Sequence, residues 1–166
     1  MGDQWFLDEV FVKINGKQHY LWRAVDQDGC ELDVLLTKKR DKKSALKFFK
    51  KLFKGQKQQP RKITTDKLTS YKAALSDLGS NTPHITRQYQ NNIAEISHQK
   101  TRQQQRQMRQ FVSIAQAQRF LSCHGVINNH FRHQRHLLKA RHYRLLRDRA
   151  FYQWAQVTCV QNLKIA

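Results

Sequence analysis

The first part of the chain carries the pattern that most constrains the fold, which is two alternating apolar segments joined by a tight-turn dipeptide. Residues 5–14, WFLDEVFVKI, mix aromatic and β-branched side chains in near alternation, which predicts a β-strand. Asn15-Gly16 follows directly, and this dipeptide is favoured at the centre of a two-residue hairpin turn. Residues 17–26 have the composition of a returning strand. We therefore expect the chain to begin with an antiparallel hairpin.

The next stretch adds a third strand and a helix. Residues 27–29, Gln-Asp-Gly, predict a second turn, and residues 31–37, ELDVLLT, predict a third strand. Residues 42–55 place apolar side chains at helical spacing, so an amphipathic helix that stops at Gly55 is expected. Its apolar face holds Ala45, Phe48, Phe49 and Leu52. We interpret the lysines on the other face as a solvated surface rather than a binding surface.

A crossover back to the sheet is predicted after this helix. Residues 61–65 read as a short strand that ends at Asp66, and they are followed by a helix at 70–78 and a further strand at 84–89. This order of elements predicts an α/β fold with a mixed sheet, in which the strand at 61–65 lies beside the first strand. That pairing would bring Asp8 and Asp66 together.

The second half of the chain is predicted to be helical, with a break at 111–113 and a weaker one at Gly125. We expect a core domain at 1–112 and a helical basic extension at 113–166 that packs on it. Its first helix is expected to face the core with Phe120, Leu121, Val126, Ile127 and Phe131.

The charge of the chain points to a polyanionic partner. Thirty-one Lys and Arg against 12 Asp and Glu give a formal charge of +19, so nucleic acid is the first candidate and an anionic membrane surface the second. No apolar run reaches the length needed to span a bilayer, and no signal peptide is recognisable. The three cysteines are far apart, which fits a reducing compartment. We expect a cytoplasmic protein with no membrane partner.

One carboxylate stands out in the basic second half. Glu95 is the only Asp or Glu within residues 79–147. If 92–109 is helical, Glu95 shares one stripe of the helix with Arg102, Arg106 and Arg109. Glu95 could stabilise this helix through charge pairs. Alternatively it could bind a divalent metal while the arginines hold nucleic-acid phosphates, which requires partner carboxylates elsewhere.

The histidines at 130, 133 and 136 form a second candidate group. They recur at every third residue, so they would spread round a helix rather than converge on a metal. We therefore favour histidines that face nucleic acid over a zinc site.

Asp8 is the natural partner for Glu95. It lies in the middle of an apolar strand, where an unpaired charge would cost several kcal/mol. Asp8, Asp66 and Glu95 together would offer an oxygen-rich site suited to Mg²⁺ and to phosphoryl transfer. Composition and periodicity alone do not single these three acids out, because others lie nearby, namely Glu9, Asp26, Asp28, Asp33 and Asp41.

Three ordered motifs resolve this choice by resemblance. They are WFLDEVFVKINGKQHYLWRAVDQDG, TTDKLTSY, and NNIAEISHQKTRQQQRQM followed by QAQRFLSCHGVINNHFR. They resemble the catalytic core of DDE transposases from bacterial insertion sequences, and they are most similar to insertion-sequence family six. The resemblance covers nearly the whole chain. It implies a fold of the retroviral-integrase and ribonuclease-H-like type.

The resemblance also implies a site and a reaction. Asp8, Asp66 and Glu95 match the metal-binding triad for Mg²⁺, with Mn²⁺ as a substitute, whereas Glu9 is not included. The implied reaction is cleavage at transposon ends to expose a 3′-hydroxyl, followed by attack of that hydroxyl on target DNA. It implies a homodimer or higher oligomer associated with the bacterial nucleoid. From their positions, we expect Lys67, Arg102, Arg106 and Arg109 to contact DNA phosphates.

Two features depart from the family pattern. Family members carry an N-terminal helix-turn-helix region, which we expect to be absent because the chain begins only seven residues before Asp8. The 28 residues between Asp66 and Glu95 form a shorter spacing than is usual in the superfamily, and a short loop at 79–83 would explain it. The alternatives are a truncated, inactive remnant that binds DNA, and a nuclease without transfer activity.

Overall fold

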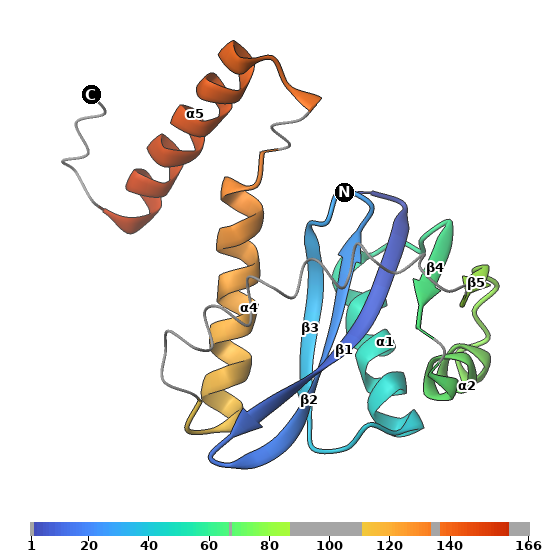
Figure 1. Ribbon diagram of the computed structural model, residues 1–166. Coiled ribbons are helices and arrows are strands. Elements are labelled where there is room, and N and C mark those ends of the chain that lie inside the picture. Colours follow the sequence, from blue (N-terminus) through green and yellow to red (C-terminus); the bar gives the residue numbers. More distant parts are fainter. Residues whose placement is uncertain (1, 67, 87–110, 134–136, 160–166) are drawn as a thin grey trace. The chain divides into compact units, whose positions relative to one another are not determined.

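The computed structural model describes residues 2–66, 68–86, 111–133 and 137–159 (Figure 1). Its elements are β1 (Gln4–Ile14), β2 (Lys17–Asp26), β3 (Glu31–Thr37), α1 (Lys42–Gln56), β4 (Lys62–Thr65), α2 (Thr69–Asp77), β5 (His84–Ile85), α4 (Ile114–Phe131) and α5 (Ala140–Thr158). They fall into two compact units, Met1–Val126 and Ile127–Ala166. The functional boundary that we expect at residue 112 stays a prediction.

The N-terminal hairpin is confirmed. β1 and β2 pair antiparallel without interruption from Trp5 opposite Asp26 to Ile14 opposite Lys17. Asn15 and Gly16 have φ angles of 48° and 73°, the pair of positive values that a type I′ turn requires. The predicted turn is therefore present, and it sets the register of this hairpin.

The sheet has the order β3-β2-β1-β4-β5. β3 is antiparallel to β2, whereas β4 runs parallel to β1 and β5 parallel to β4. This mixed sheet confirms the predicted α/β class and the predicted place of β4 beside β1. β5 is shorter in the described part of the chain than the predicted strand at 84–89, whose residues 87–89 lie outside it.

One face of the sheet is covered by α1 and α2. The buried residues of α1 are the four that the helical spacing predicts, and they pack with Trp5 and Leu7 of β1 and Tyr71 of α2. The expected stop at Gly55 is wrong. The helix runs to Gln56, and Lys57 ends it in the left-handed conformation, with its N–H donating to the Phe53 carbonyl.

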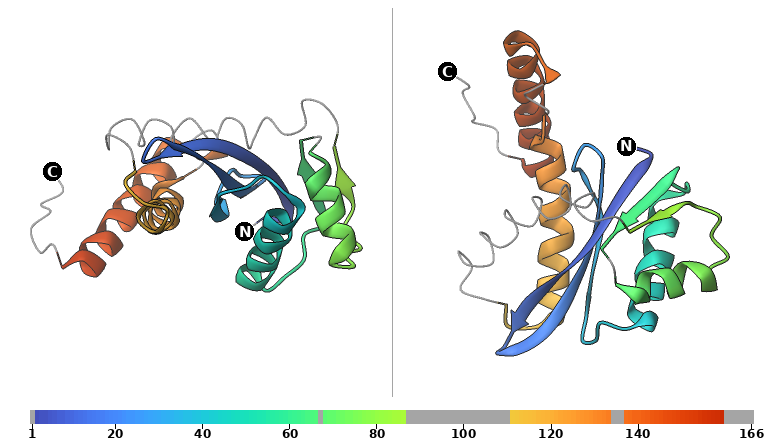
Figure 2. Two further views of the ribbon diagram at one scale, coloured as in Figure 1. Left: turned by 90° about the horizontal axis from the view of Figure 1, so that it is seen from below. Right: turned by 45° about the vertical axis from the view of Figure 1, so that its right-hand side comes forward.

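The first part of α4 covers the other face, so α1 and α4 lie on opposite sides of the strands (Figure 2). Ala117 and Leu121 of α4 pack with Val10 and Val12 of β1. The predicted break at 111–113 is confirmed, since α4 begins at Ile114. Before it, the Phe111 carbonyl accepts a 3.0 Å hydrogen bond from the Asn15 N–H.

Two expectations for α4 are wrong. The helix continues through Gly125 without a break. The close contact explains the glycine, because this buried residue faces Glu31 so closely that a Cβ would overlap the Glu31 carboxylate. Glu31 in turn pairs with the buried Arg23 at 2.8 Å. Val126, which we expect on the core face, is 70 % exposed.

The second unit is helical, as predicted, over the end of α4 and all of α5. Phe131 contacts the rings of Phe151 and Trp154 at centroid distances of 5.0 and 5.7 Å. The Nε2 atom of His130 donates to the Ala150 carbonyl at 2.8 Å. Within the described residues, no helix is both long and apolar enough to cross a membrane.

Candidate active site

Asp8 and Asp66 come together at the end of a parallel strand pair. The last paired positions of β1 and β4 are Leu7 and Thr65, so the next residue of each strand is an aspartate. Carboxylate oxygens of Asp8, Glu9 and Asp66 lie within 4.8 Å of one another. The expectation that the crossover brings Asp8 and Asp66 close together is confirmed.

Glu9 is the acid that the sequence reasoning left out. Side chains alternate along a strand, so Glu9 points to the same side as Trp5 and Leu7, toward the layer of α1 and α2. Its side chain is only 2 % exposed. The Tyr71 hydroxyl donates to Glu9 Oε2 at 2.8 Å. An acid in register with two buried apolar residues was the signal that could have identified it.

Arg40 ties two of the acids together. Its guanidinium forms an ion pair with Glu9 and lies 3.4 Å from Asp66 Oδ2. Arg40 belongs to the connection between β3 and α1, directly before Asp41, whose carboxylate caps α1 by accepting from the Ser44 N–H at 2.8 Å. The capped start of α1 therefore positions the Arg40 guanidinium beside Glu9 and Asp66.

The electrostatics of the cluster favour a further positive charge. The pKa of Glu9 is raised to about 7 by burial and then by the charges of Asp66 and Asp8, against the opposing effects of Tyr71 and Arg40. The pKa of the buried Tyr71 is also raised, by desolvation and by Glu9. Oxygen donors of this kind fit a hard divalent cation such as Mg²⁺.

Asp66 is held by the chain around it. Its Oδ1 atom accepts from the Leu68 N–H at 3.0 Å. The Thr65 hydroxyl donates to the Asp66 carbonyl at 2.7 Å, so its 2.9 Å contact with His84 Nε2 requires the histidine to donate. Burial and nearby Lys72 lower the pKa of His84, which keeps that ring neutral.

The remaining site predictions lie outside the described residues: Glu95, Lys67, Arg102, Arg106 and Arg109. Of the histidine series, His136 also lies outside, while His130 is engaged by the Ala150 carbonyl. Within the part of the chain that the structure describes, Asp8, Glu9 and Asp66 form the one group of three side chains able to share a metal ion.

The family model of the DDE domain, of the IS240 transposase type, matches residues 2–134. The chain belongs to the DDE transposase family. This family is one of polynucleotidyl transferases that generally use divalent metal, and the chain is of the insertion-sequence family six type that its motifs resemble.

Curated relatives extend beyond this DDE domain. A transposase for insertion sequence-like element IS431mec of Staphylococcus aureus is 40 % identical over 100 residues, which are 57 % of this chain and 44 % of the relative. The transposase for insertion sequence element IS257 in transposon Tn4003, also from Staphylococcus aureus, matches to the same extent. The chain thus spans less than half the length of these relatives.

Among solved structures, the DDE domain is similar to the catalytic core domain of HTLV-2 integrase in complex with magnesium. The identity is 18 %, the TM-score is 0.48, and the similarity covers 60 % of this chain and 66 % of the integrase chain. For the catalytic core domain of BIV integrase the identity is 14 % and the TM-score 0.47, with the same coverage.

Proposed function

We propose that this chain is the catalytic domain of a DNA transposase that cleaves transposon ends and joins the exposed 3′-hydroxyl to target DNA. The observation that carries the proposal is the approach of Asp8 and Asp66, which directly follow the last paired positions of the parallel strands β1 and β4. Membership of the DDE transposase family supports it.

In this proposal Asp8 and Asp66 hold a divalent cation, Mg²⁺ or Mn²⁺, and Glu95 supplies the third carboxylate. The cation would stabilise charge on the transferring phosphate and activate the attacking oxygen. Glu9 stays within the protein, where Tyr71 and Arg40 hold it, and it sets the position of Arg40 beside Asp66. Because β1, β4 and the capped start of α1 position Asp8, Asp66 and Arg40, these three groups are in place before DNA arrives.

The DNA partner is proposed from the charge of the chain together with its family. A formal charge of +19 favours association with a polyanion. Lys67, Arg102, Arg106 and Arg109 are proposed to contact phosphates on either side of the reacting one. Joining two transposon ends requires at least two active sites, so we propose a dimer or higher oligomer that acts at the bacterial nucleoid in the cytoplasm.

The test is strand transfer with a labelled DNA that carries a transposon end, measured with Mg²⁺, with Mn²⁺ and with EDTA. Asp8→Asn, Asp66→Asn and Glu95→Gln should each abolish joined products, and Asp28→Asn, a change at an exposed turn acid, should not. Activity that survives all three changes would contradict the proposal. Cleaved but never joined DNA would indicate a nuclease instead.

A further inference from the structure

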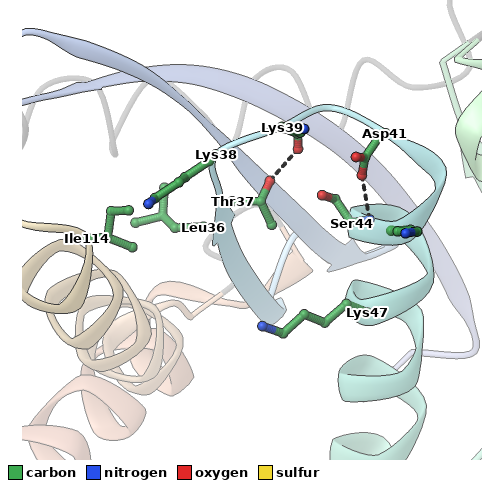
Figure 3. Close-up of a pocket in the computed structure, with 9 residues that line it drawn as sticks. Leu36, Thr37, Lys38, Lys39, Asp41, Ser44, Lys47 and Ile114 are labelled. Carbon is green, nitrogen blue, oxygen red and sulfur yellow. Dashed lines mark hydrogen bonds between the residues drawn. The ribbon is translucent and has the colours of Figure 1, made fainter.

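A second feature of the first unit is a hollow lined in part by the connection between β3 and α1. A hollow of about 350 Å³ opens between the end of β3, the start of α1 and Ile114 at the start of α4 (Figure 3). Lys38 and Lys39 line it from the connection after β3, and Lys43 and Lys47 line it from α1. We call this group of four side chains and the space between them the lysine pocket.

The lysine pocket has an excess of positive charge. All four lysines are exposed, and none takes part in the described ion pairs, in which other lysines of α1 bind Asp77 and Asp33. The one acid in the lining is Asp41, whose carboxylate is already occupied by the Ser44 N–H. That hydrogen bonding, followed by the charges of Lys39 and Lys43, lowers the pKa of Asp41. Asp41 therefore stays ionised, but four lysines against one carboxylate leave a net positive charge that suits the pocket to an anion.

Hydrogen bonds of the Thr37 hydroxyl hold the connection that carries Lys38 and Lys39. The Thr37 hydroxyl accepts from the indole Nε1 of Trp22 at 2.8 Å and donates to the Lys39 carbonyl at 2.7 Å (Figure 3). Trp22 is fully buried, so a core residue holds the backbone of the pocket. Because the backbone is already ordered, ligand binding has only the lysine side chains left to order, which reduces the entropy loss.

The pocket and the carboxylate cluster share this connection. Arg40 lies between Lys39 and Asp41 in the sequence, and its guanidinium reaches Glu9 and Asp66. Consecutive Cα atoms are about 3.8 Å apart. This one connection therefore carries lysines of the pocket and, between them and Asp41, the arginine of the carboxylate cluster.

We propose that the lysine pocket binds a backbone phosphate of the DNA on which the transposase acts. The inference rests on the proposed function only in taking DNA as the ligand. It changes the interpretation of two lysines of α1, Lys43 and Lys47, from a solvated surface to a binding surface. Lys50 and Lys54 continue the same helical stripe but do not line the pocket.

This difference supplies a matched pair of variants. The full chain carrying Lys43→Gln and Lys47→Gln is compared with the chain carrying Lys50→Gln and Lys54→Gln, so helix, stripe and charge change are the same. Binding to a fluorescein-labelled DNA duplex is measured in EDTA over a range of salt concentrations. Circular dichroism melting verifies that both variants fold.

The pocket variant should bind more weakly. The slope of log K against log salt should fall in magnitude by about 0.9, which is the contribution of one phosphate contact. The Lys50 and Lys54 variant should keep nearly the wild-type slope. Equal losses in the two variants would mean that only total charge matters, and no loss in either would mean that the pocket does not touch DNA. Each of these results overturns the proposal.

A second measurement locates the contact. Methylphosphonate groups, which carry no charge, replace single phosphates along the duplex. Wild-type binding should weaken at one or two positions, and the Lys43 and Lys47 variant should be insensitive at those same positions. Sensitivity that is unchanged in the variant overturns the proposal, as does competition by free phosphate or an acidic peptide as effective as that by DNA.

The outcome is separable from that of the proposed function, because these measurements contain no metal. If strand transfer is present but the two lysine variants bind alike, the pocket proposal alone fails. If strand transfer is absent while the pocket variant loses its phosphate contact, the proposed reaction alone fails.

Discussion

The Tyr71 hydroxyl of α2 donates a 2.8 Å hydrogen bond to the Glu9 carboxylate of β1. This bond ties a helix of the covering layer to an acid that lies within 4.8 Å of Asp8 and Asp66. Tyr71 is fully buried, so its hydroxyl cannot exchange this partner for bulk water. Glu9 thus connects the packing of the helices to the charge of the candidate active site.

Replacing Tyr71 with Phe should lower the free energy of unfolding by about 1.5–3 kcal/mol, as is typical for loss of a hydrogen bond to a charged group. Denaturant unfolding at pH 8 in EDTA measures the change. Tyr20→Phe is the matched control, because among the described residues the Tyr20 hydroxyl accepts only a 3.3 Å hydrogen bond from the exposed Gln18 amide. Its effect should stay within about 0.5 kcal/mol. Equal losses at the two positions would contradict this account.

The raised pKa of Glu9 predicts a stability that depends on pH. The folded protein holds a proton on Glu9 up to about pH 7, whereas the unfolded chain releases it near 4.5. Between these values the folded state binds more protons, so stability falls as pH rises, by up to about 3 kcal/mol. Glu9→Gln should remove this contribution.

The measurement is the free energy of unfolding of wild type and Glu9→Gln at pH 5, 6, 7 and 8 in EDTA. The wild-type value should decline relative to the variant across this range. Asp28→Asn, at an exposed turn, should run parallel to wild type. Parallel curves for Glu9→Gln as well would show that Glu9 titrates at its ordinary pKa.

Removing the cation at position 40 should make the protein depend more on metal. Arg40→Gln leaves Glu9 and Asp66 without their shared guanidinium, so the metal-free variant should melt at a lower temperature. Mn²⁺ or Mg²⁺ should raise its Tm more than that of wild type, and at lower metal concentration. Lys42→Gln, which breaks the outlying pair with Asp77, should respond to metal as wild type does. Identical metal responses for Arg40→Gln and wild type would refute the prediction.

The two helical glycines should respond to alanine in opposite directions. At Gly125 an added Cβ would overlap the Glu31 carboxylate, and overpacking of this kind costs about 1–3 kcal/mol. At Gly55 the nearest atom is Asp33 Oδ2 at 3.9 Å, so Gly55→Ala should stabilise by about 0.5–1 kcal/mol. Thermal unfolding of the two variants tests this, and a gain in Tm for Gly125→Ala would contradict it.

The hairpin and the approach of Asp8 to Asp66 could be predicted from the sequence, because the first follows from turn chemistry and the second from a rule of strand connection. Asn15-Gly16 specifies the turn, and a strand-helix-strand crossover sets β4 beside β1. Arg40 could not be predicted in this way. It lies in a connection with no periodicity, and its partners are defined only once the sheet has formed.

The lysines of α1 show a second limit of sequence patterns. Lys43, Lys47, Lys50 and Lys54 share one stripe of the helix, so helical spacing makes them equivalent. Only the connection held by Thr37 separates the first two from the others. Gly125 shows the same limit. A glycine that ends a helix and a glycine that allows a close contact within a helix cannot be told apart from the sequence.

The parallel pairing of β1 with β4 has a consequence for the way the protein matures. These strands are separated in the sequence by two further strands and a helix, so their pairing requires closure of a long loop and comes late in a typical folding order. Asp8 and Asp66 stay apart until that step. A nascent or partly folded chain would then carry its two aspartates in separate places, and under the proposed function the ability to cut DNA would arise only as folding is completed.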